Sequence, residues 1–444
     1  MQKNTLVAAT FTAALLATTS IAPISSAEAK TQVQFWHAMG GAQGERVERL
    51  AREFNESQDE YEVIATFKGS YAETMTGAIA AFRAREQPHI VQVFEVGTAT
   101  MMGATGAIYP VHQLMADAGE PFDPDVFLPA VTGYYTTADG LMLSMPLNSS
   151  TPVLWYNKDA FAAAGLDPES PPATWPEFEE AAAALQAAGY PCGLTTAWES
   201  WVHIENLSAL HNQPLGTLAN GFEGLGTELV FNQTVAVDHI AKMGEWQTTK
   251  IFDYGGRTNQ AAPKFYNQEC AMFTESSAGY AGMVANVTDF EFGIGMLPYW
   301  PDVEGAPQNS IIGGASLWVL QGHEAEEYEG VARFFTYLSS PEVQAWYHQE
   351  TGYLPITQAA YELTREQGFY EKFPGADISV RQITLNPPTE NSRGLRFGNF
   401  VQIRDIIAEE LERVWAGQAT AQEALDEAVR RGNELIRQFE AQQG

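Results

Sequence analysis

The feature that most constrains the fold is the regular alternation of strand and helix patterns that begins at Val33. A strand pattern alternates apolar and polar side chains, whereas a helix pattern repeats apolar residues every three or four positions. The expected elements are a strand at 33–37, a helix with its apolar face at 47–54, a strand at 61–67, a helix at 72–85 and a strand at 89–94. This order predicts an α/β fold with a largely parallel sheet and helices on both faces.

The loops that follow the predicted strands are the expected ligand-binding region. In open α/β sheets the ligand crevice lies outside the carboxyl ends of the strands. Three loops have this position, at 37–44, 68–71 and 95–97. A second α/β pattern runs from Asn157 to about Ile311, and the C-terminal part is helical.

The chain is too long for one ordinary core. Its 444 residues, of which 45% are hydrophobic and 18% charged, predict a globular protein of two lobes. We expect lobe 1 to comprise 30–147 and 314–349, and lobe 2 to comprise 148–313 and 350–444. The chain would cross between the lobes near 147–150, near 312–314 and near Glu350.

The first 29 residues have the pattern of a signal peptide. Lys3 supplies a positive charge, residues 6–16 an apolar stretch, and Ala27-Glu28-Ala29 a cleavage site. The alternative is an anchor helix, but Thr, Ser and Pro23 interrupt the apolar stretch before the roughly 20 residues that a bilayer requires. We therefore expect an exported, soluble protein in the periplasm.

The charge of the chain excludes some partners. A formal net charge of −31 repels nucleic acids and anionic membrane surfaces, so we expect neither as a partner. An anionic small molecule is still compatible with this charge, because distant charges are screened over about 8 to 10 Å. We expect a monomer.

The two cysteines, Cys192 and Cys270, each lie beside an apparent strand. Disulfides persist in oxidising compartments, so an exported chain favours a disulfide between them. The alternative is two buried thiols.

Catalytic patterns are missing from the sequence. It contains no G-x-S-x-G, H-E-x-x-H or G-x-x-x-x-G-K-[ST], and its eight histidines are dispersed. We predict no catalytic residue, no metal site and no cofactor. A binding protein is therefore favoured over an enzyme.

Several residues have the chemistry of a ligand crevice. Trp198 and Trp201 are spaced to share a helix face, although core packing is the commoner role of an aromatic side chain. Glu95 follows an apolar strand and is interpreted either as a hydroxyl acceptor in the crevice or as a solvated charge. The pair Gly313-Gly314 interrupts a strand, which indicates a bend or a close backbone approach.

Two further positions suit an anion. Ser276 and Ser277 offer hydroxyl and N–H groups at a strand-to-helix junction. Arg404 stands in an apolar helix, where a guanidinium is costly unless it is paired. It either pairs with a carboxylate such as Asp405 or Glu409, or binds an anion.

The segment 145–166 carries a family resemblance. A turn rich in small polar residues (148–151), an apolar strand (153–156), and Asn157-Lys158-Asp159 opening a helix resemble the lobe-crossing signature of bacterial extracellular solute-binding proteins of ABC importers. The resemblance implies a two-lobed periplasmic-binding-protein fold of the maltose-binding type (type II). It also implies capture of a small molecule by lobe closure.

Longer runs narrow this resemblance. Nearly the whole chain from Phe35 resembles the periplasmic glycerol-3-phosphate-binding proteins, in the runs 95–102, 148–154, 306–309, 311–319, 351–357, 363–372 and 394–399. The ligand residues of that family fall here on Tyr71, Glu95, Ser150, Trp198, Ser276, Gly314, Tyr353 and Arg404. The resemblance implies that Ser150, Ser276, the Gly314 amide, Tyr353 and Arg404 surround a phosphate, while Tyr71, Glu95 and Trp198 face the glycerol.

The implied ligand is sn-glycerol 3-phosphate, delivered to a membrane permease with two transmembrane subunits and an ATPase. Relatives that favour glycerophosphocholine lack the tryptophan found here at 198, so its presence favours glycerol 3-phosphate. Two departures near the site, Phe94 in place of a tyrosine and Met145-Pro-Leu147, bear on fine specificity. The alternatives are an exported glycerophosphodiester hydrolase and a binding protein for a neutral sugar.

Overall fold

The computed structural model describes residues 1–2 and 29–443, and the expected signal peptide lies almost entirely outside this part. The strands are β1 Thr31–His37, β2 Tyr61–Phe67, β3 Ile90–Phe94, β4 Ile108–Tyr109, β5 Met145–Ser150, β6 Pro152–Asn157, β7 Cys192–Thr196, β8 Cys270–Ser276, β9 Phe292–Met296 and β10 Gly313–Leu320. The helices are α1 Gly41–Ser57, α2 Tyr71–Ala84, α3 Thr98–Met102, α4 Val111–Asp117, α5 Pro129–Tyr135, α6 Lys158–Ala163, α7 Trp175–Ala187, α8 Leu207–Leu210, α9 Thr217–Asn220, α10 Val235–Thr249, α11 Ala262–Tyr266, α12 Tyr280–Asn286, α13 Ala325–Leu338, α14 Pro341–Thr351, α15 Gln358–Glu366, α16 Phe369–Lys372, α17 Ile378–Ile383, α18 Phe400–Trp415 and α19 Ala421–Glu440.

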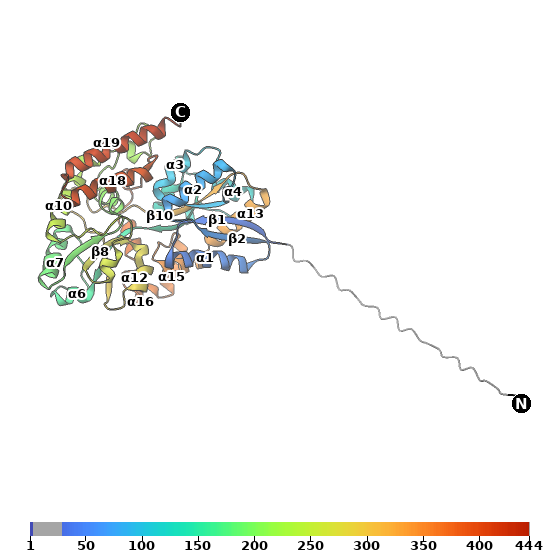
Figure 1. Cartoon of the computed structure of the whole chain (residues 1–444), viewed down its shortest axis with the longest axis horizontal. Helices are drawn as coiled ribbons and strands as arrows, with labels where there is room; N and C mark the ends of the chain where they lie inside the picture. Colours follow the sequence, from blue (N-terminus) through green and yellow to red (C-terminus); the bar gives the residue numbers. More distant parts are fainter. Residues whose placement is uncertain (3–28, 444) are drawn as a thin grey trace.

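The strands form two separate sheets, one in each half of the molecule (Figure 1). The first has the order β2-β1-β3-β10-β4, with β5 also paired to β10, and the second has the order β7-β8-β6-β9. The predicted parallel pairing holds for β1, β2 and β3, whereas β10 runs antiparallel to its neighbours. In the second sheet only β7 and β8 are parallel. This α/β architecture of two lobes confirms the predicted fold class.

The predicted N-terminal elements are present with shifts of one or two residues at most of their ends. The apolar positions of the first helix pattern, Val47, Leu50, Ala51 and Phe54, are buried along one face of α1. The helix signals near the C-terminus are also confirmed. Ser340 caps α14, Gly352 ends it with φ +77°, and Thr420 with Glu423 forms the capping box of α19.

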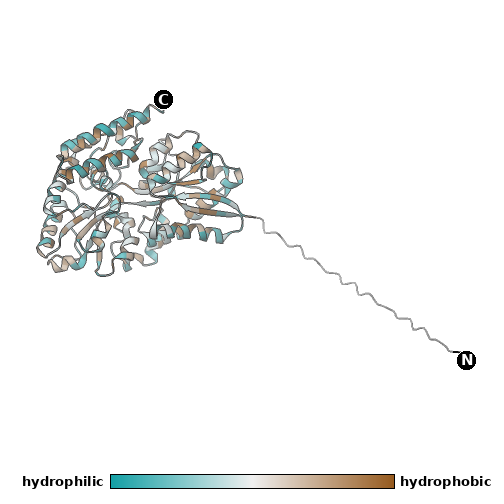
Figure 2. Ribbon diagram, viewed as in Figure 1, coloured by the Kyte–Doolittle hydropathy of each residue, from teal (hydrophilic) through white to brown (hydrophobic). Residues whose placement is uncertain are grey.

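The outer helices have one hydrophilic and one hydrophobic side, as Figure 2 shows for α19. Leu425 and Ile436 lie on the buried side of this helix, which packs on α18 and α10. No helix among the described residues is long and apolar enough to cross a membrane.

The chain passes between the two sheets at the end of β5. Ser150 is the last residue of β5 and Pro152 the first of β6, so a single residue, Thr151, separates the sheets along the chain. The chain returns between β9 and β10. The predicted boundaries 147/148 and 313/314 therefore fall inside strands of the first sheet, and the assignment of residues to lobes stays a prediction.

A disulfide holds the edge of the second sheet. Cys192 in β7 and Cys270 in β8 are directly opposite each other in the parallel ladder and are joined. This confirms the expected pairing. The bridge closes a loop of 78 residues, which stabilises the fold mainly by restricting the unfolded chain.

Candidate functional site

The candidate ligand residues lie at strand ends, helix starts and connections, and both sheets contribute to them. Glu95 directly follows β3, Ser150 and Ser276 end β5 and β8, and Gly314 is the second residue of β10. Tyr71 begins α2, Trp198 follows β7, Tyr353 follows α14, and Arg404 lies in the first half of α18. Glu95, Ser150 and Ser276 thus lie at the carboxyl ends of their strands, the position where the sequence places the ligand region. Their role as a ligand set stays a prediction.

Gly314 is placed by a backbone conformation that other residues rarely adopt. Its φ is +92°, and a Cβ atom at this position would overlap the carbonyl oxygen of Asn148. The neighbouring Gly313 lies against the indole of Trp201. Glycine is therefore needed here for a close approach between β10 and β5, as expected from the interrupted strand.

The β ladders bring the two serines near this turn. Gly313 pairs with Ser150 and Gly314 with Ser149, while Pro152 pairs with Ser276. The Ser276 hydroxyl oxygen accepts a hydrogen bond from the Ala278 N–H at 3.0 Å, which leaves its own O–H as a donor. The N–H groups of Ser276, Ser277 and Ala278 already donate to Glu275 Oε1, the Thr151 carbonyl and Ser276 Oγ, so the segment offers an anion the Ser276 hydroxyl rather than these N–H groups.

Arg404 contacts two buried carboxylates, and neither is a partner that the sequence suggested. Its Nε and Nη2 donate to Glu205 Oε1 and Oε2 at 2.7 and 2.6 Å, and Nη2 also donates to Glu95 Oε1 at 2.5 Å. The proposed partners Asp405 and Glu409 are wrong, because both lie on other faces of α18, and Glu409 pairs with Arg431. We call Glu95, Glu205 and Arg404 the charged cluster.

The charged cluster holds one guanidinium and two carboxyl groups away from water. The side chains of Glu95, Glu205 and Arg404 are 3%, 0% and 13% exposed. Burial raises the pKa of Glu95 to about 7, although the neighbouring guanidinium of Arg404 acts to lower it. Burial acts to lower the pKa of Arg404, but the two carboxylates raise it above its ordinary value. The interpretation of Glu95 as a solvated loop charge is therefore wrong.

A second, uncharged group of side chains lies beside the charged cluster. The Gln92 amide donates to Asn148 Oδ1 at 2.8 Å, and Asn148 Nδ2 donates to the Tyr71 phenol oxygen at 3.0 Å. The Tyr71 ring stacks on Phe94 at 5.1 Å, and Tyr353 lies next to Tyr71 and Asn148. Burial raises the pKa of both phenols, so they stay neutral at physiological pH. We call Tyr71, Gln92 and Asn148 the neutral cluster.

Trp198 differs from its predicted setting. It has φ +50°, in the left-handed region, and it precedes the helix that contains Trp201, so the two indoles do not share a helix face. Trp201 is buried, whereas Trp198 is partly exposed between two apolar clusters and hydrogen-bonds to Glu275. Strained non-glycine residues of this kind gather at functional sites.

Sequence reasoning missed three polar residues of this region: Asn148, Glu205 and Glu275. Asn148 is part of the turn that carries the family resemblance, and its full burial was the missing observation. A carboxylate within the apolar stretch 201–207 was an available signal for Glu205. Its partner Arg404 is 199 residues away, so the sequence alone did not predict the pair.

The histidines include a cluster that their dispersal in the sequence did not suggest. His89, His323 and Glu327 place potential metal-ligand atoms within 4.8 Å of one another. However, the Gln34 N–H donates to His89 Nδ1 at 2.9 Å, so in the neutral ring Nε2 carries the proton, 3.5 Å from Glu327 Oε2. A protonated nitrogen does not suit a metal ligand.

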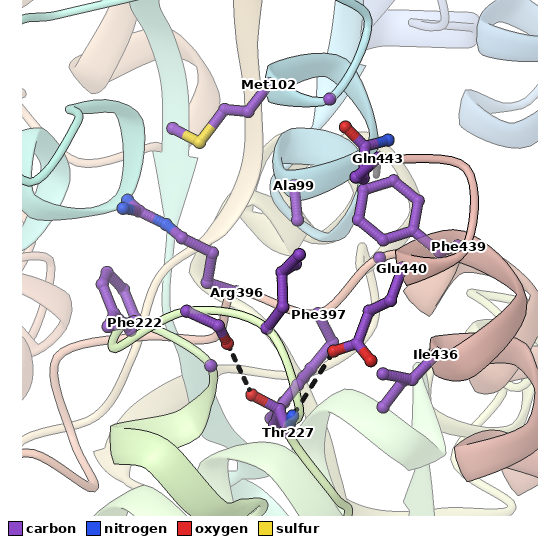
Figure 3. A pocket seen from close by; sticks show the side chains of 15 residues that line it. Ala99, Met102, Phe222, Thr227, Arg396, Phe397, Ile436, Phe439, Glu440 and Gln443 are labelled. Atoms are coloured by element: carbon purple, nitrogen blue, oxygen red, sulfur yellow. Dashed lines mark hydrogen bonds between the residues drawn. The ribbon is translucent and has the colours of Figure 1, made fainter.

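A cavity of about 280 Å³ lies between α3 of one half and α19 of the other (Figure 3). Its walls are mainly apolar, with Phe222, Phe397 and Phe439, and Glu440 accepts from the Thr227 N–H at 3.4 Å. None of the eight candidate ligand residues lines it.

Comparison with known proteins identifies the family. Residues 49–374 match the model of the bacterial extracellular solute-binding proteins. The chain belongs to this family.

The most similar relatives include the sn-glycerol-3-phosphate-binding periplasmic protein UgpB of Salmonella typhimurium, which is 51% identical over 95% of this chain and 96% of its own. The same protein of an Escherichia coli strain (O6:K15:H31) is 50% identical over 97% of this chain and 98% of its own.

Solved structures agree on the fold. UgpB from Mycobacterium tuberculosis, in complex with glycerophosphocholine, has a TM-score of 0.77 at 21% identity over 92% of this chain and 99% of its own. The cyclic α-maltosyl-1,6-maltose binding protein from Arthrobacter globiformis has a TM-score of 0.72 at 22% identity over 92% of this chain and 100% of its own. These likenesses support the two-lobed maltose-binding-like fold.

Proposed function

We propose that this protein is the exported solute-binding component of an ABC importer and that it captures sn-glycerol 3-phosphate between its two lobes. It would act in the periplasm as a monomer and deliver the ligand to a permease of two transmembrane subunits with an ATPase. No catalytic step is part of this function. The close similarity to periplasmic proteins named for binding sn-glycerol 3-phosphate supports the ligand.

The observation that carries the proposal is the placement of Arg404 opposite hydrogen-bonding groups of both halves. Its guanidinium, in α18, contacts Glu95 at the end of β3, so it lies where the two lobes meet. A guanidinium makes forked hydrogen bonds with phosphate oxygens, which are among the strongest that a protein offers. The similarity to proteins named for binding sn-glycerol 3-phosphate favours a phosphate ester over the alternative of a neutral sugar.

The proposed contacts divide the ligand into two ends. Ser150, Ser276, the Gly314 amide, Tyr353 and Arg404 would surround the phosphate, and the glycerol would lie against Tyr71, Glu95 and Trp198. Contacts to both lobes favour the closed form, since closure is driven by the difference in affinity between the two forms. Interlobe contacts such as Gln43 Nε2 to the Ala278 carbonyl at 2.9 Å would strengthen it.

Calorimetry and thermal unfolding with glycerol 3-phosphate, glycerophosphocholine, inorganic phosphate and maltose test the proposal. Glycerol 3-phosphate at 100 times its Kd should stabilise the protein by about 2.7 kcal/mol. Stabilisation by maltose alone would refute it. Stoichiometric binding of glycerophosphocholine without turnover would exclude the hydrolase alternative, whereas release of choline would support it.

A further inference from the structure

Glu205 has no part in the proposed ligand set, yet it makes the most extensive contact with Arg404. It lies in the π-helical segment Trp201–Asn206, a type of helix that is frequent at functional sites. Its Oε1 accepts from Arg404 Nε at 2.7 Å and from Ser200 Oγ at 3.0 Å, and its Oε2 accepts from Arg404 Nη2 at 2.6 Å. Both carboxylate oxygens are therefore held in one orientation.

This contact determines which edge of the guanidinium faces a ligand. An arginine has five N–H donors, and Glu205 takes two of them, one on Nε and one on Nη2. The second N–H of Nη2 goes to Glu95. Within residues 29–443, Nη1 has no hydrogen-bond partner, so the edge formed by Nη1 and Nη2 is the edge that a phosphate can reach.

We propose that Glu205 is the positioning residue that gives the site its selectivity for a phosphate ester that also carries hydroxyls, over a phosphate alone. This inference rests on the proposed function. A phosphate that binds the Nη1–Nη2 edge takes the N–H that Glu95 holds. Glu95 then needs a new donor, and a hydroxyl of the glycerol supplies one.

Inorganic phosphate has no carbon-bound hydroxyl and can offer Glu95 only a P–OH proton, whereas glycerol 3-phosphate offers Glu95 a glycerol hydroxyl and keeps its phosphate oxygens for Arg404. The selectivity also requires a fixed guanidinium. A ligand held at both ends needs Arg404 in one position, whereas a free phosphate adjusts to several. Glu205 also keeps the net charge of the cluster at −1 when both carboxylates are ionised, which weakens the attraction for anions in general.

The test compares the Kd for inorganic phosphate with the Kd for glycerol 3-phosphate by calorimetry. Glu205→Gln has nearly the same shape but loses the charge and one of the two acceptor positions. We expect the Kd for inorganic phosphate divided by the Kd for glycerol 3-phosphate to fall at least tenfold. Glycerol 3-phosphate should bind more weakly, and inorganic phosphate should bind equally or more tightly. A ratio within threefold of wild type in folded Glu205→Gln overturns the inference.

Glu205→Asp serves as a second variant, because it keeps the charge but is too short to hold both nitrogens. If Glu205→Gln does not fold, the same threefold limit applies to Glu205→Asp. Glu410→Gln is the matched control: Glu410 is also buried and paired with arginines, Arg413 and Arg431, but it lies outside the charged cluster. Its ratio should equal that of wild type, and a tenfold fall there would also overturn the inference.

The outcome separates this inference from the proposed function. If the wild-type protein does not bind glycerol 3-phosphate, the proposed function fails whatever the variants do. If the wild type binds and Arg404→Ala does not, while Glu205→Gln keeps the wild-type ratio, only the role of Glu205 is wrong.

Discussion

The charged and neutral clusters lie side by side, and their buried polar groups find hydrogen-bond partners in different ways. In the neutral cluster the amides of Gln92 and Asn148 and the phenol of Tyr71 form one chain of hydrogen bonds. In the charged cluster one guanidinium serves two carboxylates. The neutral cluster forms its hydrogen bonds without a ligand, whereas the charged cluster has two carboxylates for one guanidinium, and Arg404 Nη1 has no partner among the described residues.

The two clusters therefore differ in how their interactions respond to pH and to a ligand. Neutral hydrogen bonds do not depend on pH within the physiological range, so the neutral cluster keeps its contacts across that range. The charged cluster changes its interactions when a proton or an anion arrives.

The largest expected effect comes from Arg404. Arg404→Ala leaves a desolvated phosphate without its charged partner, which should cost about 2 to 5 kcal/mol of binding free energy, or roughly 30- to several-thousand-fold in Kd. Arg404→Lys keeps the charge without the fork and should fall between wild type and alanine. Calorimetry on protein shown to be folded by circular dichroism measures both values. A Kd for Arg404→Ala within about threefold of wild type would remove Arg404 from the site.

A smaller effect concerns the pH dependence of stability without ligand. The pKa of Glu95 is about 7 in the folded protein and near 4.5 when unfolded. Between these values the unfolded chain releases its proton first, so the stability contributed by the protonated carboxyl is complete below about pH 4.5 and is lost as the pH rises to about 7. In Glu95→Gln, the fall in the free energy of unfolding over this pH range should be smaller than in wild type by about 1 to 3 kcal/mol.

Urea unfolding at pH 5 and pH 8 measures this change. Glu199 and Glu275 are also buried, with pKa values raised to about 7 and about 8, so the wild-type protein has several such contributions. Glu95→Gln should therefore flatten the pH profile without abolishing it. An unchanged difference between pH 5 and pH 8 would show that Glu95 is already ionised throughout this range.

The features that the sequence predicted correctly depend on neighbouring residues. The helix face of α1 and the caps of α14 and α19 follow from local periodicity and capping chemistry, and all are present. Gly314 was also found locally, because a glycine pair inside a strand indicates a bend or a close backbone approach. These features depend on residues within about one turn or one strand of each other.

The partners of Arg404 could not be found in this way. Asp405 and Glu409 were suggested because they are near in sequence, whereas Glu95 and Glu205 are 309 and 199 residues away. The shared helix face of Trp198 and Trp201 was wrong for a related reason, because the left-handed backbone at Trp198 places it before the helix. Family resemblance supplied the candidate ligand residues but not Glu205, whose contact is with Arg404.

The smallest expected effect tests the neutral cluster. Tyr71→Phe keeps the ring that stacks on Phe94 but removes the oxygen that accepts from Asn148 Nδ2. Asn148 is fully buried, so its N–H would lose its partner, and the free energy of unfolding should fall by about 1 kcal/mol. The loss should be equal at pH 5 and pH 8, because the pKa of Tyr71 lies well above both.

Tyr347→Phe is the matched control: its hydroxyl has no hydrogen-bond partner among the described residues, so its removal should cost little or nothing. Equal losses in the two variants would show that the Asn148 bond adds no stability, and a loss that grows with pH would show that the neutral cluster is coupled to the ionisation of Glu95.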